Sequence, residues 1–225
     1  GGAMNYKGEL SRHIINTDFL HPGFGLFFRH NIDRRWCWKV SMNFGRISGD
    51  DALASTAFER NRNLSFYSDI FEISPQIELN FLPYETGNSD YPFTPYIFTG
   101  LSIFHFNPKA ELNGTTYDLQ PMGTEGQGLN GTKKYKRTAF ALPIGGGLKI
   151  SIGTIGIGLE VGARRAYTDY LDDVSTTYPD LNALRASGGN TAVLLSDRSL
   201  LPSDTSLISL PSAFHKQRGN SKDPD

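Results

Sequence analysis

The segment DIFEISPQIELNFLPY, residues 69–84, alternates apolar and polar side chains over most of its length. One row holds Phe71, Ile73, Ile77, Leu79 and Phe81, and the opposite row holds Glu72, Ser74, Gln76, Glu78 and Asn80. Successive side chains of a β-strand point to opposite faces of its sheet, whereas side chains on a helix repeat every 3.6 residues. The segment therefore predicts a strand with one apolar face and one polar face.

The same alternation recurs along the chain. It is regular in WCWKVSMNFG (36–45), in FALPIGGGLKISI (140–152) and over residues 155–164, and it is less regular in HPGFGLFFRHN (21–31) and TPYIFTGLSIFHFN (94–107). GGAMNYKGEL (1–10) is typical of a first, shortened strand. We therefore expect one all-β domain over residues 1–225, with seven strands within about residues 1–168.

The composition excludes several classes of protein. A formal charge of −1 gives no general attraction to nucleic acid, so we expect no nucleic-acid partner. The chain has no apolar run long enough for a spanning helix. Cys37 is the only cysteine, which excludes an internal disulfide and a cysteine-based metal cluster, and we expect it to fill space on a strand.

Alternation alone does not say which face is inside. In a soluble sandwich or lipocalin-like barrel the apolar row points inward, whereas in a membrane barrel it faces lipid. The polar rows here combine many glycines, which weaken strands, with charges of both signs. Such rows fit a narrow lumen filled by small side chains and ion pairs. We expect a lumen ion-pair network of Lys39, Glu72, Glu78, Lys149, Glu160 and Arg164.

The links between the strands alternate between short and long. NIDRR (31–35), YETGNSDYPF (84–93) and GT (153–154) are short, whereas residues 46–66, 108–137 and the chain from about 168 onward are long. This layout is typical of an outer-membrane barrel with short periplasmic turns. We therefore predict an eight-stranded antiparallel up-and-down transmembrane β-barrel in the bacterial outer membrane, in contact with its lipids.

Such barrels have an even number of strands, so we expect the closing strand to be missing from these 225 residues. Residues 205–214, interrupted by Pro211, are a poor candidate for it. We interpret about 169–225 as a long loop with short helices. Pro179 and Asp180 come before one of these helices and Gly188 ends it.

Several segments resemble the PorG-like family of Bacteroidetes outer-membrane β-barrel proteins, which are components of the type IX secretion system. They are NYKGEL, RISGDD, RNLSFYSDIFEIS, IELNF, PYIFTGLSIFHFNPKA, YDLQPMGTEGQG, PIGGGLKI and GLEVGARRAYTDYLDDVSTTY. The chain departs from the family's pattern at a short first strand and an absent last strand.

The resemblance implies a non-enzymatic outer-membrane anchor for protein transport and, in gliding species, gliding motility. Its implied partners are a periplasmic ring lipoprotein and that lipoprotein's partner subunit. The loop signature residues are candidate partner contacts: Asp50, Asp51, Tyr167, Asp169, Tyr170, Asp172 and Asp173.

No catalytic, cofactor or metal site is predicted. The five histidines show no metal-ligand spacing, and the chain has neither a G-x-S-x-G elbow nor a phosphate loop. His105 lies near a strand end, where a barrel lipase would have its histidine, but we expect it to be an interfacial residue. The loop aspartates either bind a divalent cation or form solvated turns that contact Arg60, Arg62 and Arg165.

Two other functions are open at this point. A soluble ligand-binding barrel would line its pocket with the rows of Trp36, Phe71 and Leu159. A small outer-membrane barrel used for adhesion or structure would share the predicted fold and differ in its partners. An eight-stranded barrel interior is just wide enough for side chains, so the predicted barrel conducts neither solutes nor protein.

Overall fold

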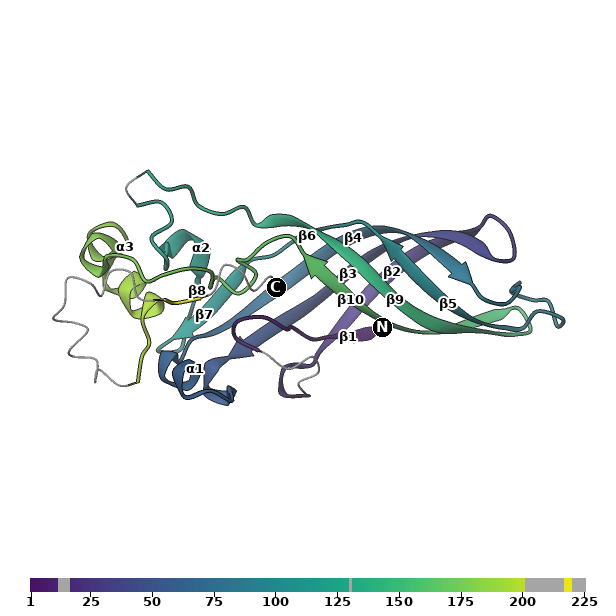
Figure 1. The fold of residues 1–225 in the computed structure, drawn as a ribbon, viewed down its shortest axis with the longest axis horizontal. Helices are drawn as coiled ribbons and strands as arrows, with labels where there is room; N and C mark the ends of the chain where they lie inside the picture. The colour runs from purple at the N-terminus through teal and green to yellow at the C-terminus, as the bar shows by residue number, and fades with distance from the viewer. Residues whose placement is uncertain (12–16, 130, 201–216, 220–225) are drawn as a thin grey trace.

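The computed structural model describes residues 1–11, 17–129, 131–200 and 217–219. It is a β-structure with short helices gathered at one end (Figure 1). The strands are β1 (Gly2–Met4), β2 (His21–Asn31), β3 (Trp36–Asp50), β4 (Ser65–Asn80), β5 (Phe93–Gly100), β6 (Ser102–His105), β7 (Pro108–Leu112), β8 (Thr115–Asp118), β9 (Thr138–Ile152) and β10 (Ile155–Ala166). The helices are η1 (Thr17–Phe19), η2 (Asp51–Leu53), α1 (Ala57–Arg62), α2 (Leu119–Met122) and α3 (Leu181–Ser196).

All the strands belong to one antiparallel sheet, as the alternating sequence predicted. Its order is β1-β2-β3-β4-β5-β9-β10. β6 continues β5 between β4 and β9. β7 pairs with Tyr67 and Ser68 near the start of β4 and forms a hairpin with β8. The sheet thus has ten strands in the described residues rather than seven. The predicted fifth strand is interrupted at Leu101 and at Phe106 and Asn107, and β7 and β8 form within the predicted long loop 108–137.

The predicted short links lie at the end opposite the helices (Figure 1), and those between β2 and β3 and between β9 and β10 are tight turns. In the β2–β3 turn, Asp33 Oδ1 accepts hydrogen bonds from the backbone N–H groups of Arg35 (2.6 Å) and Trp36 (2.7 Å). The β9–β10 link is Gly153 and Thr154, and Gly153 has a φ of 59°, which favours glycine. These turns fix the register of the long hairpins.

The faces of the sheet are inverted relative to a soluble protein. Leu159 and Val161 on β10 are 68% and 76% exposed. Phe71, Ile77 and Phe81, from the apolar row of residues 71–81, are also exposed. The polar row of β4 is buried, and Glu78 is 0% exposed. We call the polar side the interior face and the apolar side the outer face.

The interior face becomes apolar toward the helical end. Ile47 of β3 and Phe66 and Ile70 of β4 share their strands' polar rows, yet they belong to a hydrophobic cluster with Tyr6 and Phe106. The non-strand segments at this end form what we call the loop cap: residues 5–11, 17–20, 51–64, 119–129, 131–137, 167–200 and 217–219. The interior is therefore closed by packed side chains under the loop cap.

Two helices of the loop cap begin at capped residues. Thr56 Oγ1 accepts from the backbone N–H of Glu59 at the start of α1. Asp180 Oδ1 accepts from the N–H groups of Asn182 and Ala183 at the start of α3, and α3 is broken at Gly189, where φ is 72°. The expected helix after Asp180 is present, and its break falls one residue beyond the expected stop at Gly188.

The two end strands of the sheet, β1 and β10, do not pair with each other in the described part of the chain. β1 covers only residues 21–23 of β2. The candidate strand at residues 205–214 lies outside the described residues. No helix in the described ranges is long and apolar enough to cross a membrane.

Candidate functional site

The six residues of the predicted ion-pair network all lie on the interior face, and each pairs with at least one other member of the set. β3 supplies Lys39, β4 supplies Glu72 and Glu78, β9 supplies Lys149, and β10 supplies Glu160 and Arg164. The strand alternation that puts apolar residues outside places each of these side chains inside. Contacts between β3 and β10 require the sheet to curl, because β4, β5 and β9 lie between them in the sheet.

Glu78 is the centre of this interior charge network. Its carboxylate lies 2.6 Å from Lys149 Nζ, 3.1 Å from Lys39 Nζ and 2.9 Å from Arg29 Nη2. The Cys37 thiol also donates to it at 3.0 Å. A fully buried carboxylate thus has three cationic partners, which offsets the cost of removing its charge from water.

Glu160 and Glu72 hold the other cations of the interior charge network. Lys39 Nζ lies 2.6 Å from Glu160 Oε2, and the hydroxyl of Tyr96 donates to the same oxygen at 2.7 Å. Arg164 Nε lies 2.8 Å from Glu72 Oε2. These bonds tie β10 to β3, β4 and β5 across the interior.

Four partners in this network were not predicted: Arg29, Cys37, Asn80 and Tyr96. Arg29 gave a sequence signal, since it is the charged residue on the interior row of β2. Cys37 and Asn80 lie on polar rows that the alternation had assigned to the interior, and Asn80 Oδ1 accepts from Lys149 at 2.8 Å. Tyr96 gave no distinct signal, because its ring looks like any other aromatic residue near a turn.

This arrangement is suited to holding strands together. Each acidic and basic side chain of the predicted set is within 3.1 Å of an opposite charge. Bonds between side chains on different strands specify one curvature and one register.

A second buried cluster lies in the loop cap, around Asp51. Arg62 makes a two-pronged contact with it, Nε to Oδ2 at 2.7 Å and Nη2 to Oδ1 at 2.8 Å. Asp51 Oδ2 also accepts the backbone N–H of Leu64 at 3.0 Å. Both charged side chains are almost completely buried, so Asp51 is not part of a solvated turn as one interpretation of the sequence had it.

Asp173 is the centre of a third cluster. Its carboxylate accepts hydrogen bonds from the hydroxyl of Thr124, from Gln127 Nε2 at 3.2 Å and from the Tyr135 hydroxyl at 2.7 Å. Arg218 Nη2 lies 3.9 Å away. Asp173 is fully buried, which again differs from a solvated loop.

Arg218 joins the clusters of the loop cap. It lies 3.1 Å from Glu125 and donates to the carbonyl oxygens of Ser196 and Asp173, while its own carbonyl oxygen accepts from Arg62 Nη1 at 2.5 Å. The sequence did not single out Arg218, because nothing near it marks a partner so far away in the chain.

The remaining loop signature residues have separate positions. Asp50 caps η2 through the N–H of Ala52, Asp169 accepts from the Ser175 hydroxyl, and Asp172 accepts from the Tyr6 hydroxyl at 2.8 Å. The ring of Tyr170 stacks on Tyr135 with centroids 4.6 Å apart, and Tyr167 is exposed. Of the arginines expected beside these acids, Arg60 instead donates to the carbonyl oxygens of Ala54 and Ser55.

Burial shifts the pKa values of these loop-cap groups. It raises the pKa of Asp51 despite the opposing Arg62. It raises the pKa of Asp173 to about 6, although Arg218 and the hydrogen bonds to the carboxylate act in the other direction. Burial and the negative charge of Asp173 raise the pKa of Tyr135. The pKa of the Asp173 carboxyl is therefore close to neutral pH.

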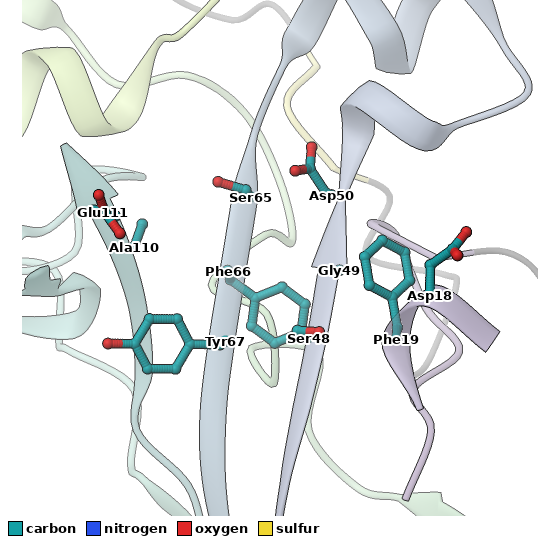
Figure 2. Close-up of a pocket in the computed structure, with 10 residues that line it drawn as sticks. All are labelled: Asp18, Phe19, Ser48, Gly49, Asp50, Ser65, Phe66, Tyr67, Ala110 and Glu111. Carbon is teal, nitrogen blue, oxygen red and sulfur yellow. The ribbon is translucent and has the colours of Figure 1, made fainter. Parts of the chain in front are cut away.

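The loop end also has a surface pocket of about 300 Å³ between η1, β3, β4 and β7. Figure 2 shows Asp18 and Asp50 on one side of it and Glu111 on the other, so the three carboxylates do not converge on one point. In the described ranges, no group of three or more His, Cys, Asp or Glu side chains is placed to hold a metal ion.

Comparison with known families gives a match over most of the chain. A family model described as a domain of unknown function (DUF6089) matches residues 1–192. No curated protein and no solved structure matches the chain.

Proposed function

We propose that this chain, which belongs to the DUF6089 family, is a non-enzymatic anchor in the bacterial outer membrane, built as an eight-stranded β-barrel. The observation that carries the proposal is the inversion of the sheet, with apolar side chains outside and paired charges inside. In water the exposed apolar rows would be costly, whereas lipid is the solvent that they match.

The height of the apolar rows supports this location. Along β4 and the residue that follows it, the outer face is apolar from Phe71 to Phe81, which corresponds to about 33 Å at about 3.3 Å per residue. A strand tilt of about 40° reduces this to about 25 Å, the usual height of the apolar band in such barrels. Trp36 and Trp38 lie near the turn end of β3, as residues of an interfacial aromatic girdle do.

The edges of the sheet support an eighth strand. β1 and β10 both run toward the loop cap, since β1 is antiparallel to β2 and β10 to β9. One strand that runs the other way would pair antiparallel with both and would remove the open edges that lipid does not tolerate. In this proposal the closing strand is contributed from outside the described residues.

The filled interior supports a role at the two ends of the barrel. The interior charge network and the apolar cluster under the loop cap occupy the space that a channel would need. We assign the anchor to the type IX secretion system on the resemblance of its segments to the PorG-like family. Its turn end would dock the ring lipoprotein and its partner subunit, and the loop cap would face outward.

Two alternatives differ from this proposal in observable ways. A soluble ligand-binding barrel needs Trp36, Phe71 and Leu159 to line a pocket, but these side chains are 43%, 47% and 68% exposed on the outer face. An adhesin would share the fold and would make its contacts through the loop cap.

A crosslinking experiment in cells tests the proposal. A photoreactive residue replaces Arg35 in the β2–β3 turn, and a matched one replaces Arg185 in α3. The proposal predicts that the protein fractionates with the outer membrane and that the Arg35 position traps periplasmic secretion subunits. Crosslinks to outside components from the Arg185 position alone would support the adhesin, and recovery as a water-soluble monomer would exclude both membrane functions.

A further inference from the structure

The apolar band of the outer face ends at one level on four adjacent strands. The pairs Phe44↔Phe71, Phe71↔His105 and His105↔Thr138 lie in register across β3, β4, β6 and β9. The next outward-facing residues toward the loop cap are Arg46, after Phe44 on β3, and Asp69, before Phe71 on β4. This level is the boundary between apolar wall and polar surface on the loop side.

The basic segment that precedes β9 reaches the sheet at this boundary. It approaches from the loop end (Figure 1), and its last residue, Arg137, accepts a backbone hydrogen bond from Phe106 at 2.9 Å. The Tyr135 hydroxyl donates to Asp173 in the loop cap, whereas the side chain of Lys136 is exposed. Lys136 precedes the boundary residue Thr138 of β9 by two positions, so it lies on the loop-cap side of the apolar band.

Cations outnumber carboxylates at the loop-cap end of β3, β4 and β7 and in the segment that leads into β9. We call these residues the rim patch, and its basic residues are Arg46, Lys109, Lys133, Lys134, Lys136 and Arg137. Arg46 is paired with Asp69 at 2.7 Å and Lys109 with Asp118 at 3.7 Å, and Glu111 is a further carboxylate nearby on β7. Lys133 and Lys136 are exposed and have no ion pair with a described residue.

Other contacts hold the patch in place without neutralising it. Lys134 Nζ donates to the carbonyl oxygen of Pro121 at 2.9 Å, and Arg137 donates to Asn107 Oδ1 at 2.9 Å. The guanidinium of Arg46 lies over the ring of Tyr67, 4.7 Å from its centroid. The segment is thus positioned by neutral partners, and its positive charge is left for a ligand.

We propose that the rim patch binds the phosphate groups of lipids in the leaflet on the loop side. This inference rests on the membrane location proposed above. A phosphate-bearing lipid matches the arrangement because its acyl chains would lie along Phe71, Ile103 and Phe140 while its phosphate meets Lys136 and Lys133. Lysines near an anionic membrane surface each strengthen association about fivefold. A soluble anion would match the charges but would make no use of the apolar wall directly below them.

Spin-labelled lipids test this in vesicles of zwitterionic phosphatidylcholine that hold the full chain. The immobilised fraction of labelled phosphatidic acid is compared with that of labelled phosphatidylcholine. Wild type should prefer phosphatidic acid about fivefold or more. Lys133→Gln/Lys136→Gln should lose most of that preference, whereas Arg35→Gln/Arg185→Gln, which removes the same charge elsewhere, should keep it.

Each other outcome has a definite meaning. If wild type and the lysine variant prefer phosphatidic acid equally, the rim patch does not bind the lipid phosphate. Immobilised phosphatidylcholine in both would show that the membrane location still holds. Displacement of the labelled lipid by inorganic phosphate, beyond the effect of chloride at the same ionic strength, would identify free phosphate as the ligand and overturn the lipid assignment. Absence of any immobilised lipid would contradict the membrane location and the rim patch together.

Discussion

Lys39 Nζ lies 2.6 Å from Glu160 Oε2, although their strands, β3 and β10, are separated in the sheet by β4, β5 and β9. A flat sheet would hold these side chains far apart, since neighbouring strands are about 4.8 Å from one another. The contact therefore records the curl of the sheet, and it places charge on the concave side. The same curl turns Leu159 and Val161 away from the interior.

Glu78→Gln should destabilise the protein strongly. The change leaves Arg29, Lys39 and Lys149 without their shared carboxylate, and breaking a buried ion pair costs about 3–5 kcal/mol. Urea unfolding of protein refolded in detergent micelles measures this. The control is Glu85→Gln, whose exposed pair with Arg34 is worth less than about 1 kcal/mol. Equal stability of the two variants would show that the interior charge network does not hold the strands.

Gly147→Ala should impair folding, whereas Gly158→Ala should be tolerated. A Cβ atom at Gly147 would lie 2.2 Å from the carbonyl oxygen of Leu159 and 2.8 Å from the Tyr96 ring. At Gly158 the nearest atom would be 3.7 Å away. Overpacking of this kind costs about 1–3 kcal/mol. Heat-modifiable gel migration gives the folded fraction of each variant, and equal fractions would contradict this packing of β9 against β5 and β10.

Asp180→Ala should loosen the start of α3 by about 1 kcal/mol, because it removes the acceptor for the N–H groups of Asn182 and Ala183. Asp180→Asn keeps an acceptor oxygen and should be close to wild type. Amide hydrogen exchange at Asn182 and Ala183 is the measurement. If both variants exchange as wild type does, Asp180 does not cap the helix.

Asp173 should make the loop cap less stable as the pH rises from about 4 to about 6. Its pKa is raised to about 6 by burial, above the usual 3.8, so within this window the folded state binds a proton that the unfolded state has lost. The groups facing it are Arg218, Glu125 and Tyr135. Amide exchange at Gln127 and Val174, corrected for the intrinsic rate, should be slower at pH 4.5 than at pH 7.

Asp173→Asn is the control for this pH effect. The amide cannot ionise, so the pH dependence assigned to Asp173 should disappear in the variant. A variant with the same pH dependence as wild type would assign the effect to another group.

The strands and the two faces of each strand were predictable because alternation is a local signal, as Phe71, Ile77 and Glu78 show on one strand. Alternation did not say which face is inside. The interior position of Lys39, Lys149 and Glu160 was predicted from the glycines and mixed charges of the polar rows and from the alternating lengths of the links. The apolar end of the interior was not predicted, because Phe66 was placed in the long link 46–66, whereas β4 begins at Ser65 and carries Phe66 and Ile70 on the row of Glu72.

The loop cap was not predictable in the same way. Arg62 was one of the arginines expected beside the loop aspartates, and it does contact Asp51. The burial of this pair and the pairing of Asp173 with Arg218 depend on how separate loops fold together. Carboxylates in a loop look solvated until the packing around them is known. The break that divides the fifth predicted strand into β5 and β6 likewise depends on its pairing with β4.

Quenching of tryptophan fluorescence by brominated lipids tests the inverted sheet most directly. The chain has two tryptophans, Trp36 and Trp38, and both lie on the outer face of β3. In vesicles we expect blue-shifted tryptophan emission that brominated acyl chains quench strongly. The Trp36→Phe variant, in which Trp38 is the only tryptophan, should behave in the same way. Emission that is indifferent to brominated lipid but quenched by acrylamide would contradict the inverted sheet.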